Sequence, residues 1–133
     1  MSKTASVMGP FDFQWIVDRA PISVIVTDLD GTIEYVNHHV LESTGYSREE
    51  LIGENPKILK SGEHDAAFYQ NIWKTVLAGG VWQGLLRNRR KHGSHYWERA
   101  YIAPFREADG TITRLIAIKE DVTESQAARE RLE

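Results

Sequence analysis

The chain has 133 residues, enough for one domain of ordinary size, and its net charge of −3 gives no bulk basic field for nucleic acid or an anionic membrane. It contains no cysteine, which excludes disulfides, thiolate metal sites and cysteine nucleophiles. No apolar run approaches the ~20 residues that a membrane-spanning helix needs, and the first ten residues do not resemble a secretory signal. The sequence therefore predicts a cytoplasmic protein, or a cytoplasmic part of a larger one, without direct membrane insertion.

The first third of the chain predicts a lead-in, a helix and a hairpin. Residues 1–10 are expected to be disordered, and Phe11–Arg19 has the apolar spacing of a short amphipathic helix. Ser23–Thr27 is rich in β-branched residues, which favours a strand. The Asp28–Gly31 segment is a turn signal, so Thr32–Val36 is predicted to return as the second strand of a hairpin.

Capping signals divide the middle of the chain into helices. Gly45 fits the C-terminal end of the first helix, and Ser47 with Glu50 forms a capping box at the start of the second. Asp65 can cap a longer third helix, whose apolar residues recur every three or four positions. The predicted helices cover His38–Thr44, Arg48–Ile52 and about Ala66–Leu77, and Glu54–His64 is predicted to be a loop.

Alternating side chains and two turn signals predict three longer strands and a final helix. Helix, hairpin, helices and then three strands is an order typical of an α+β domain with an antiparallel sheet. Thr123 or Ser125 can cap the final helix. The strands are predicted over Trp82–Arg90, His95–Phe105 and Ile112–Lys119, and the helix over Gln126–Leu132.

An ordered set of short phrases accompanies these elements. They are Ala20-Pro21-Ile22, Thr27-Asp28, Gly31, Ile33, Tyr35-Val36-Asn37, Thr44-Gly45-Tyr46, Glu49–Gly53, Trp82-Gln83-Gly84, Asn88–Lys91, Gly93, Tyr96-Trp97, Ala103-Pro104 and Asp121–Glu124. Together they resemble the PAS family of sensory domains over roughly Phe11–Glu124. The resemblance implies a five-stranded antiparallel sheet with helices packed on one face and flanking N- and C-terminal helices. It also implies a sensory domain over residues 11–122 and an exit helix over residues 123–133.

The resemblance further implies a ligand. Family members bind flavin, haem, another small molecule or nothing. The phrases around Trp73 and Asn88 are closest to the flavin-binding redox sensors of nitrogen-fixation and methane-oxidation regulators, which implies non-covalent FAD. Without cysteine, a cysteinyl–flavin adduct is excluded. The cofactor-binding residues implied by the resemblance are Trp73, Asn88, Asn55, Glu98, Lys119, Ile25, Leu86 and Ala117.

Simpler interpretations of these residues stay open. Trp73 also suits a core position beside an apolar helical stripe, and Asn88 could satisfy backbone groups. Glu98 and Lys119 could form a salt bridge at the surface or the rim between neighbouring strands. The histidines read as surface residues, which does not favour haem, and they show no convincing zinc spacing.

Parts of the sequence also fit two other function classes. The segment Val26–Thr32 resembles the nucleophile motif of haloacid-dehalogenase-type phosphatases, but a plain Asp-Gly turn explains it and the chain is short for that fold.

A cofactor-free module is the second alternative, forming a homodimer through flanking helices or the outer sheet face. In either sensory role the signal would pass through the C-terminal helix to an output domain after Glu133, for instance a histidine kinase. The interspersed basic residues Arg87, Arg89, Arg90 and Lys91 predict a solvated edge rather than a nucleic-acid site.

Overall fold

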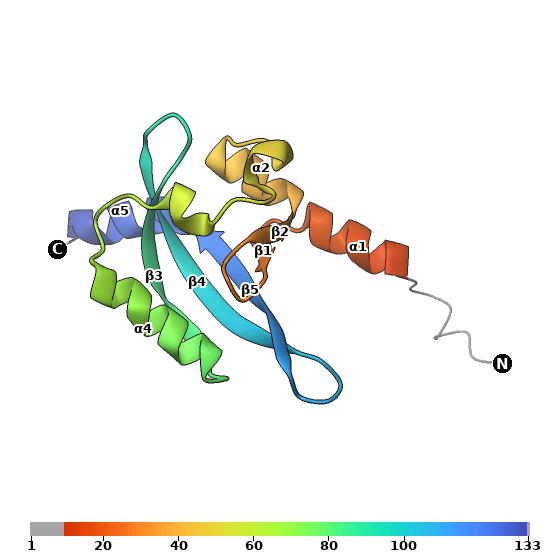
Figure 1. Ribbon diagram of the computed structural model, residues 1–133. Helices are drawn as coiled ribbons and strands as arrows, with labels where there is room; N and C mark the ends of the chain where they lie inside the picture. The colour runs from red at the N-terminus through yellow and green to blue at the C-terminus, as the bar shows by residue number, and fades with distance from the viewer. Residues whose placement is uncertain (1–9, 133) are drawn as a thin grey trace.

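The computed structural model describes residues 10–132, so the predicted lead-in lies outside the described residues except for Pro10, which begins a helix. Eleven elements follow one another along the chain (Figure 1). They are α1 (Pro10–Arg19), β1 (Ser23–Thr27), β2 (Ile33–Val36), α2 (His38–Thr44), α3 (Arg48–Leu51), the 3-10 helix η2 (Pro56–Leu59), α4 (Ala66–Leu77), β3 (Trp82–Arg89), β4 (His95–Arg106), β5 (Ile112–Asp121) and α5 (Thr123–Leu132).

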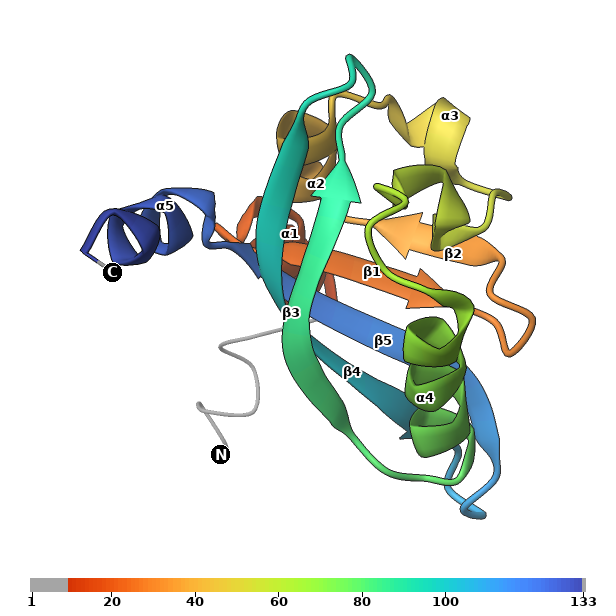
Figure 2. The same ribbon diagram turned by 90° about the vertical axis from the view of Figure 1, so that its left-hand side faces the viewer.

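The predicted α+β architecture is confirmed. The five strands form one sheet in the order β2-β1-β5-β4-β3, and all four neighbouring pairs are antiparallel. Figure 2 shows α4 lying across one face of the sheet, here called the inner face, while α5 extends away from the sheet. None of the helices within residues 10–132 is long and apolar enough to cross a membrane.

One predicted loop contains regular structure. The segment predicted as a loop over Glu54–His64 holds η2, because Asn55 caps it by accepting a hydrogen bond from the Lys57 N–H and Pro56 stands in its first turn. The last helix begins at Thr123, three residues earlier than predicted, and the Gln126 N–H already donates to the Val122 carbonyl. Other ends shift by one or two residues. For β4 and β5 the reason is antiparallel pairing, which carries them on to Arg106 and Asp121.

Two separate apolar clusters hold the helices against the sheet. One joins the β1–β2 hairpin to α2, α3 and η2, and the other joins α4 to β3 and β4. The inner face of the sheet runs between them, so the fold leaves space there that neither cluster fills. The buried members are Ile25, Ile33, Val36, Val40, Leu51 and Leu59 in the first cluster, and Ile72, Leu86 and Ala100 in the second.

Gly31 is the point where the hairpin turn meets the other elements. Its φ of +88° lies in the left-handed region that side chains other than glycine rarely adopt. A Cβ at this position would also lie 2.5 Å from the Asn55 Nδ2 and 3.2 Å from the Trp73 ring. The turn therefore needs glycine both for its backbone and for close contact with η2 and α4.

Gly31→Ala and Gly62→Ala separate these two requirements. Gly62 has the same sign of φ, at +89°, but a Cβ there would meet nothing within 4 Å. We expect Gly62→Ala to lower the free energy of unfolding by about 1 kcal/mol and Gly31→Ala to lower it by at least about 2–3 kcal/mol, because overpacking adds to backbone strain. Urea unfolding monitored by circular dichroism measures both values. Equal losses in the two variants would contradict the proposed close contact.

Candidate functional site: a cleft between α4 and the sheet

A cleft lies between α4 and the inner face of the sheet, in the space between the two apolar clusters. It holds a cavity of about 140 Å³ that opens to solvent. A cavity of this size accommodates about one six-membered aromatic ring, so a larger planar ligand must extend into the open side or displace a wall. Seven of the eight predicted site residues line it: Ile25, Asn55, Trp73, Leu86, Asn88, Ala117 and Lys119.

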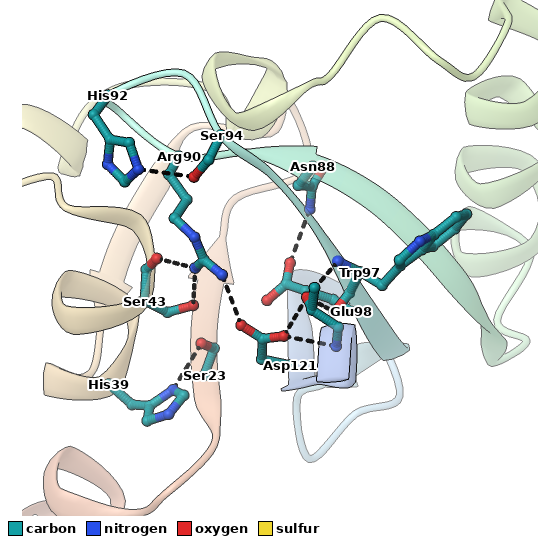
Figure 3. Close-up of polar contacts among 11 residues, drawn as sticks. Ser23, His39, Ser43, Asn88, Arg90, His92, Ser94, Trp97, Glu98 and Asp121 are labelled. Atoms are coloured by element: carbon teal, nitrogen blue, oxygen red, sulfur yellow. Dashed lines mark hydrogen bonds and ion pairs between the residues drawn. The ribbon is translucent and has the colours of Figure 1, made fainter. Parts of the chain in front are cut away.

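The eighth predicted residue, Glu98, lies behind the lining and completes a polar end of the cleft. The Asn88 Nδ2 donates a hydrogen bond to the Glu98 Oε1 at 2.8 Å (Figure 3), and the Lys119 Nζ lies 3.6 Å from the same oxygen. All three residues are buried, with 2–5% of their surface exposed. We refer to Asn88, Glu98 and Lys119 as the polar end.

Strand register explains why three distant residues meet. Asn88 on β3 stands opposite Tyr96, two residues from Glu98 on β4. Lys119 on β5 stands opposite Ala100, again two residues from Glu98. Residues two apart on a strand share a face, and such diagonal neighbours lie within reach of long side chains. Both pairings therefore bring polar side chains to Glu98 on the inner face.

The interpretation of Glu98 and Lys119 as a surface or rim salt bridge is wrong. Both side chains point into the domain, where their exposed fractions are 3% and 6%. A buried charge is costly unless it is paired and hydrogen-bonded, and here Lys119 supplies the opposite charge while Asn88 supplies the hydrogen bond. The pair is therefore part of the interior, next to the cleft.

Trp73 and Asn55 form the opposite side of the cleft. Trp73 is half-buried and belongs to neither apolar cluster, and its ring lies against Gly31. The Asn55 Nδ2 donates to the Asp30 carbonyl at 3.4 Å, which ties η2 to the hairpin turn. This arrangement favours a lining role for Trp73 over a position in the core.

A second polar network lies beside Glu98 and was not anticipated from the sequence. Asp121 stands directly opposite Glu98 across β4 and β5, and its Oδ2 pairs with the Arg90 Nη2 at 3.0 Å. Arg90 also donates to the Ser43 carbonyl of α2 (Figure 3). Its guanidinium lies over the Tyr96 ring, 4.2 Å from the ring centroid. Arg90 is thus half-buried and bonded, rather than part of a solvated edge.

The same network fixes the start of α5. The Asp121 Oδ1 accepts hydrogen bonds from the Thr123 N–H at 2.9 Å and from the Thr123 hydroxyl at 2.6 Å. The Thr123 Oγ1 in turn accepts from the Trp97 N–H at 2.9 Å. Trp97 directly precedes Glu98, so the polar end and the root of α5 share one short stretch of β4. The Asp-Val-Thr phrase in the sequence indicates this link, but nothing in the sequence identifies Arg90 as the partner of Asp121.

Burial, hydrogen bonds and neighbouring charges shift the pKa values of two ionisable groups in this region. Burial raises the pKa of the Tyr96 hydroxyl far above its usual range, and the nearby Glu98 carboxylate adds to the rise. Partial burial alone would raise the pKa of Asp121. The hydrogen bonds from Thr123 and the pairing with Arg90 outweigh it, so the pKa of Asp121 lies below its ordinary value of 3.8.

His64 differs from its predicted surface position. Its Nε2 accepts a hydrogen bond from the Arg87 N–H at 2.8 Å, and its ring stacks on Phe68 with 4.0 Å between centroids. It is therefore half-buried against the edge strand β3, and it does not line the cleft. Within residues 10–132, no three potential metal ligands form a cluster.

The phosphatase-like motif around Asp28 is a structural turn. The Asp28 Oδ1 accepts hydrogen bonds from the N–H groups of Asp30 and Thr32, both at 2.9 Å. Its carboxylate is therefore occupied in shaping the hairpin, as the plain-turn explanation predicts.

Comparisons with known proteins agree with this architecture. The model of the PAS domain family matches residues 21–124, so the chain belongs to the PAS family, whose members are sensory modules. It is 31% identical over 120 residues to the nitrogen fixation regulatory protein of Klebsiella oxytoca. That match covers 90% of this chain but 24% of the relative, so the chain spans about a quarter of that protein's length.

Solved structures give the same fold. An RNA-binding light-oxygen-voltage receptor matches with a TM-score of 0.86 at 24% identity, covering 99% of this chain and 39% of that one. A light-oxygen-voltage domain whose mechanism was examined with a flavin analogue matches with a TM-score of 0.76 at 25% identity. The second match covers 91% of this chain and 93% of that one.

The Asp121 network predicts an acid-sensitive contribution to stability. Because folding lowers the pKa of Asp121, the stabilisation is present above 3.8 and is lost as the pH falls through the lower folded-state value. We expect the wild type to be more stable than Asp121→Asn at pH 7, with the difference shrinking between about pH 5 and pH 2. Urea unfolding midpoints across this range measure it.

Glu130→Gln is the control, since it removes a carboxylate from an exposed position of α5. It should leave the acid dependence of the wild type in place. A difference between wild type and Asp121→Asn that stays constant down to pH 2 would contradict a native-state role for the ionised Asp121.

Proposed function

We propose that the chain is a sensory PAS domain that binds FAD non-covalently in the cleft and responds to its redox state or to light. The observation that carries the proposal is the convergence of Trp73, Asn88 and Lys119 on a single cleft from α4, β3 and β5. The flavin analogue named for a structural neighbour at 25% identity supports the same ligand class.

The lining suits a flavin chemically. Trp73 and the aliphatic residues Ile25, Leu86 and Ala117 offer an aromatic and apolar surface for a planar ring. The polar end offers hydrogen-bond groups for the alternating carbonyl and N–H edge of that ring. Pro56 and Ile25 give the cleft lining no hydrogen-bonding side chain at their positions, so the polar end is the main polar contact in this proposal.

The bound flavin would supply the redox chemistry by accepting electrons together with a proton. The residues of the chain would bind the ring, orient its polar edge and exclude water from it. A change in the ligand's charge alters the hydrogen bonds of Asn88 and Lys119. This change shifts the populations of two conformational states of the domain only if the oxidised and the reduced flavin bind the two states with different affinity.

Signal output in this proposal runs through α5. PAS domains commonly connect to output domains, and we place the sensory domain at residues 11–122 and the linker helix at residues 123–133. The output domain would follow Glu133, in the cytoplasm, with a histidine kinase as one candidate.

A cofactor-free dimerisation and relay module is the second candidate. It is supported by exposed apolar side chains on α1 and on the outer face of the sheet, a kind of surface that commonly marks an interface. The exposed fractions are 63% for Trp15, 46% for Ile16, 43% for Tyr101, 43% for Phe105 and 37% for Ile118. A homodimer whose stability is indifferent to FAD would favour this candidate over the first.

Titration of the purified domain with FAD tests the first candidate. We expect the bound, oxidised flavin to give its near-ultraviolet and blue absorbance bands and to stay with the protein through gel filtration. Asn88→Ala should weaken FAD binding about 5- to 30-fold, because it removes one buried hydrogen-bonding side chain from the ligand edge.

Asn71→Ala is the matched control, since Asn71 is exposed on α4 and does not line the cleft. It should bind FAD as the wild type does. A folded wild-type domain that acquires no flavin absorbance at high FAD concentration would exclude the first candidate. Equal affinity of Asn88→Ala and wild type would remove Asn88 from the site.

A further inference from the structure

Asn88 has its amide orientation dictated by Glu98. The carboxylate of Glu98 can only accept hydrogen bonds when ionised, and its Oε1 lies 2.8 Å from the Asn88 amide. The Lys119 Nζ lies 3.6 Å from the same oxygen. A flipped Asn88 would set two acceptor oxygens against each other in a buried place, so the Nδ2 group must face Glu98.

The opposite end of the Asn88 amide is therefore available to the cleft. Its Oδ1 accepts no hydrogen bond from any residue in the described part of the chain, and it is not sealed from solvent. Asn88 lines the cleft, whereas Glu98 lies behind it. Toward a ligand in the cleft, the Asn88 side chain therefore presents its acceptor oxygen and not its N–H donors.

Lys119 gives the cleft a donor beside this acceptor. Its ammonium carries three N–H groups and lines the cleft, while its contact with Glu98, at 3.6 Å, is an ion pair longer than a hydrogen bond. The polar end therefore presents an acceptor next to a cationic donor.

We propose that Glu98 is a specificity-determining residue. Without touching the ligand, it fixes Asn88 so that the cleft selects planar molecules whose edge carries an N–H donor beside a carbonyl or other acceptor. Imide rings of the kind found in flavins have this pattern. Planar ligands that present only acceptors leave the Asn88 oxygen unpaired and are disfavoured. The inference deepens the proposed function and rests on it only in taking the cleft as the ligand site.

Binding of FAD and of FAD methylated at N3 tests the selection. Methylation removes the N–H donor of the imide and leaves its carbonyl groups. We expect the wild type to bind the methylated form roughly 10- to 100-fold more weakly. In Glu98→Gln the new amide can donate as well as accept, so Asn88 is free to turn. FAD binding should then weaken several-fold, while binding of the methylated form changes little.

Glutamine is nearly the same size as glutamate, so a purely steric effect of the methyl group would persist in Glu98→Gln. Because this variant removes the charge partner of the buried Lys119, circular dichroism must first show that it is folded. Glu120→Gln is the control, since Glu120 is an exposed neighbour on β5 whose side chain points to the other face. It should keep the full preference for FAD. Equal affinity of the wild type for the two ligands, or an undiminished preference in Glu98→Gln, would overturn the inference while leaving FAD binding itself intact.

A measurement on the ligand-free protein decides the inference if FAD does not bind at all. The Asn88 side-chain amide gives a signal in ¹⁵N-edited NMR spectra that is assigned by its loss in Asn88→Ala. If Glu98 holds Nδ2, that signal should move in Glu98→Gln and stay in place in Glu120→Gln. An unmoved signal in Glu98→Gln would refute the orientation of Asn88, whereas failure of FAD to bind refutes the proposed function alone.

Discussion

The burial of Glu98 and Lys119 is the constraint on which the centre of this domain depends. A charge removed from water is tolerated only with a close partner, and leaving one member of such a pair alone costs about 3–5 kcal/mol. Here the two groups lie 3.6 Å apart and Asn88 adds a hydrogen bond at 2.8 Å. Satisfying them requires β3, β4 and β5 to keep their register, since a slip of one residue would turn Glu98 to the opposite face. The polar end thus holds the sheet in register and gives the cleft its polarity.

The space in front of this polar end follows from how the helices are distributed. One apolar cluster holds α2, α3 and η2 over the hairpin, and a second holds α4 over β3 and β4. Neither cluster covers the middle of the inner face, where Trp73 and the aliphatic lining leave a cavity. Gly31 allows the turn to approach Trp73 and Asn55, which defines the other side of the cleft. The site is therefore a cleft between two apolar clusters, with the polar end on one side and Lys57 and Lys60 also in its lining.

The sequence predicted the α-helices, the strands and the turns that join consecutive strands, because turn, capping and alternation signals are local. It did not predict η2 or the pairing of β1 with β5, which joins segments far apart in the chain. The eight candidate site residues came from a family resemblance rather than from periodicity; seven of them line the cleft and Glu98 lies behind it, and their role in holding a cofactor stays a prediction. The sequence could not predict that Glu98 and Lys119 are buried, because alternation places a residue on a face without saying which face is covered. Nor could it find the partner of Asp121. Arg90 lies 31 positions before Asp121 and 47 positions after Ser43, so only the assembled fold brings it into contact with both.

The polar end lies close to the start of α5, since Glu98 stands opposite Asp121 and the Trp97 N–H donates to Thr123. In the proposed sensor, a signal from the cleft therefore has a short path to α5. The central claim is that a flavin occupies the cleft against this polar end. Titrating ¹⁵N-labelled protein with FAD while observing side-chain N–H signals tests it most directly. The account predicts shifts of the Asn88 amide and the Trp73 indole, and no shift of the buried Asn37 amide, which donates to the Val17 and Ile22 carbonyls away from the cleft. Saturation with FAD that leaves Asn88 and Trp73 unmoved would contradict it.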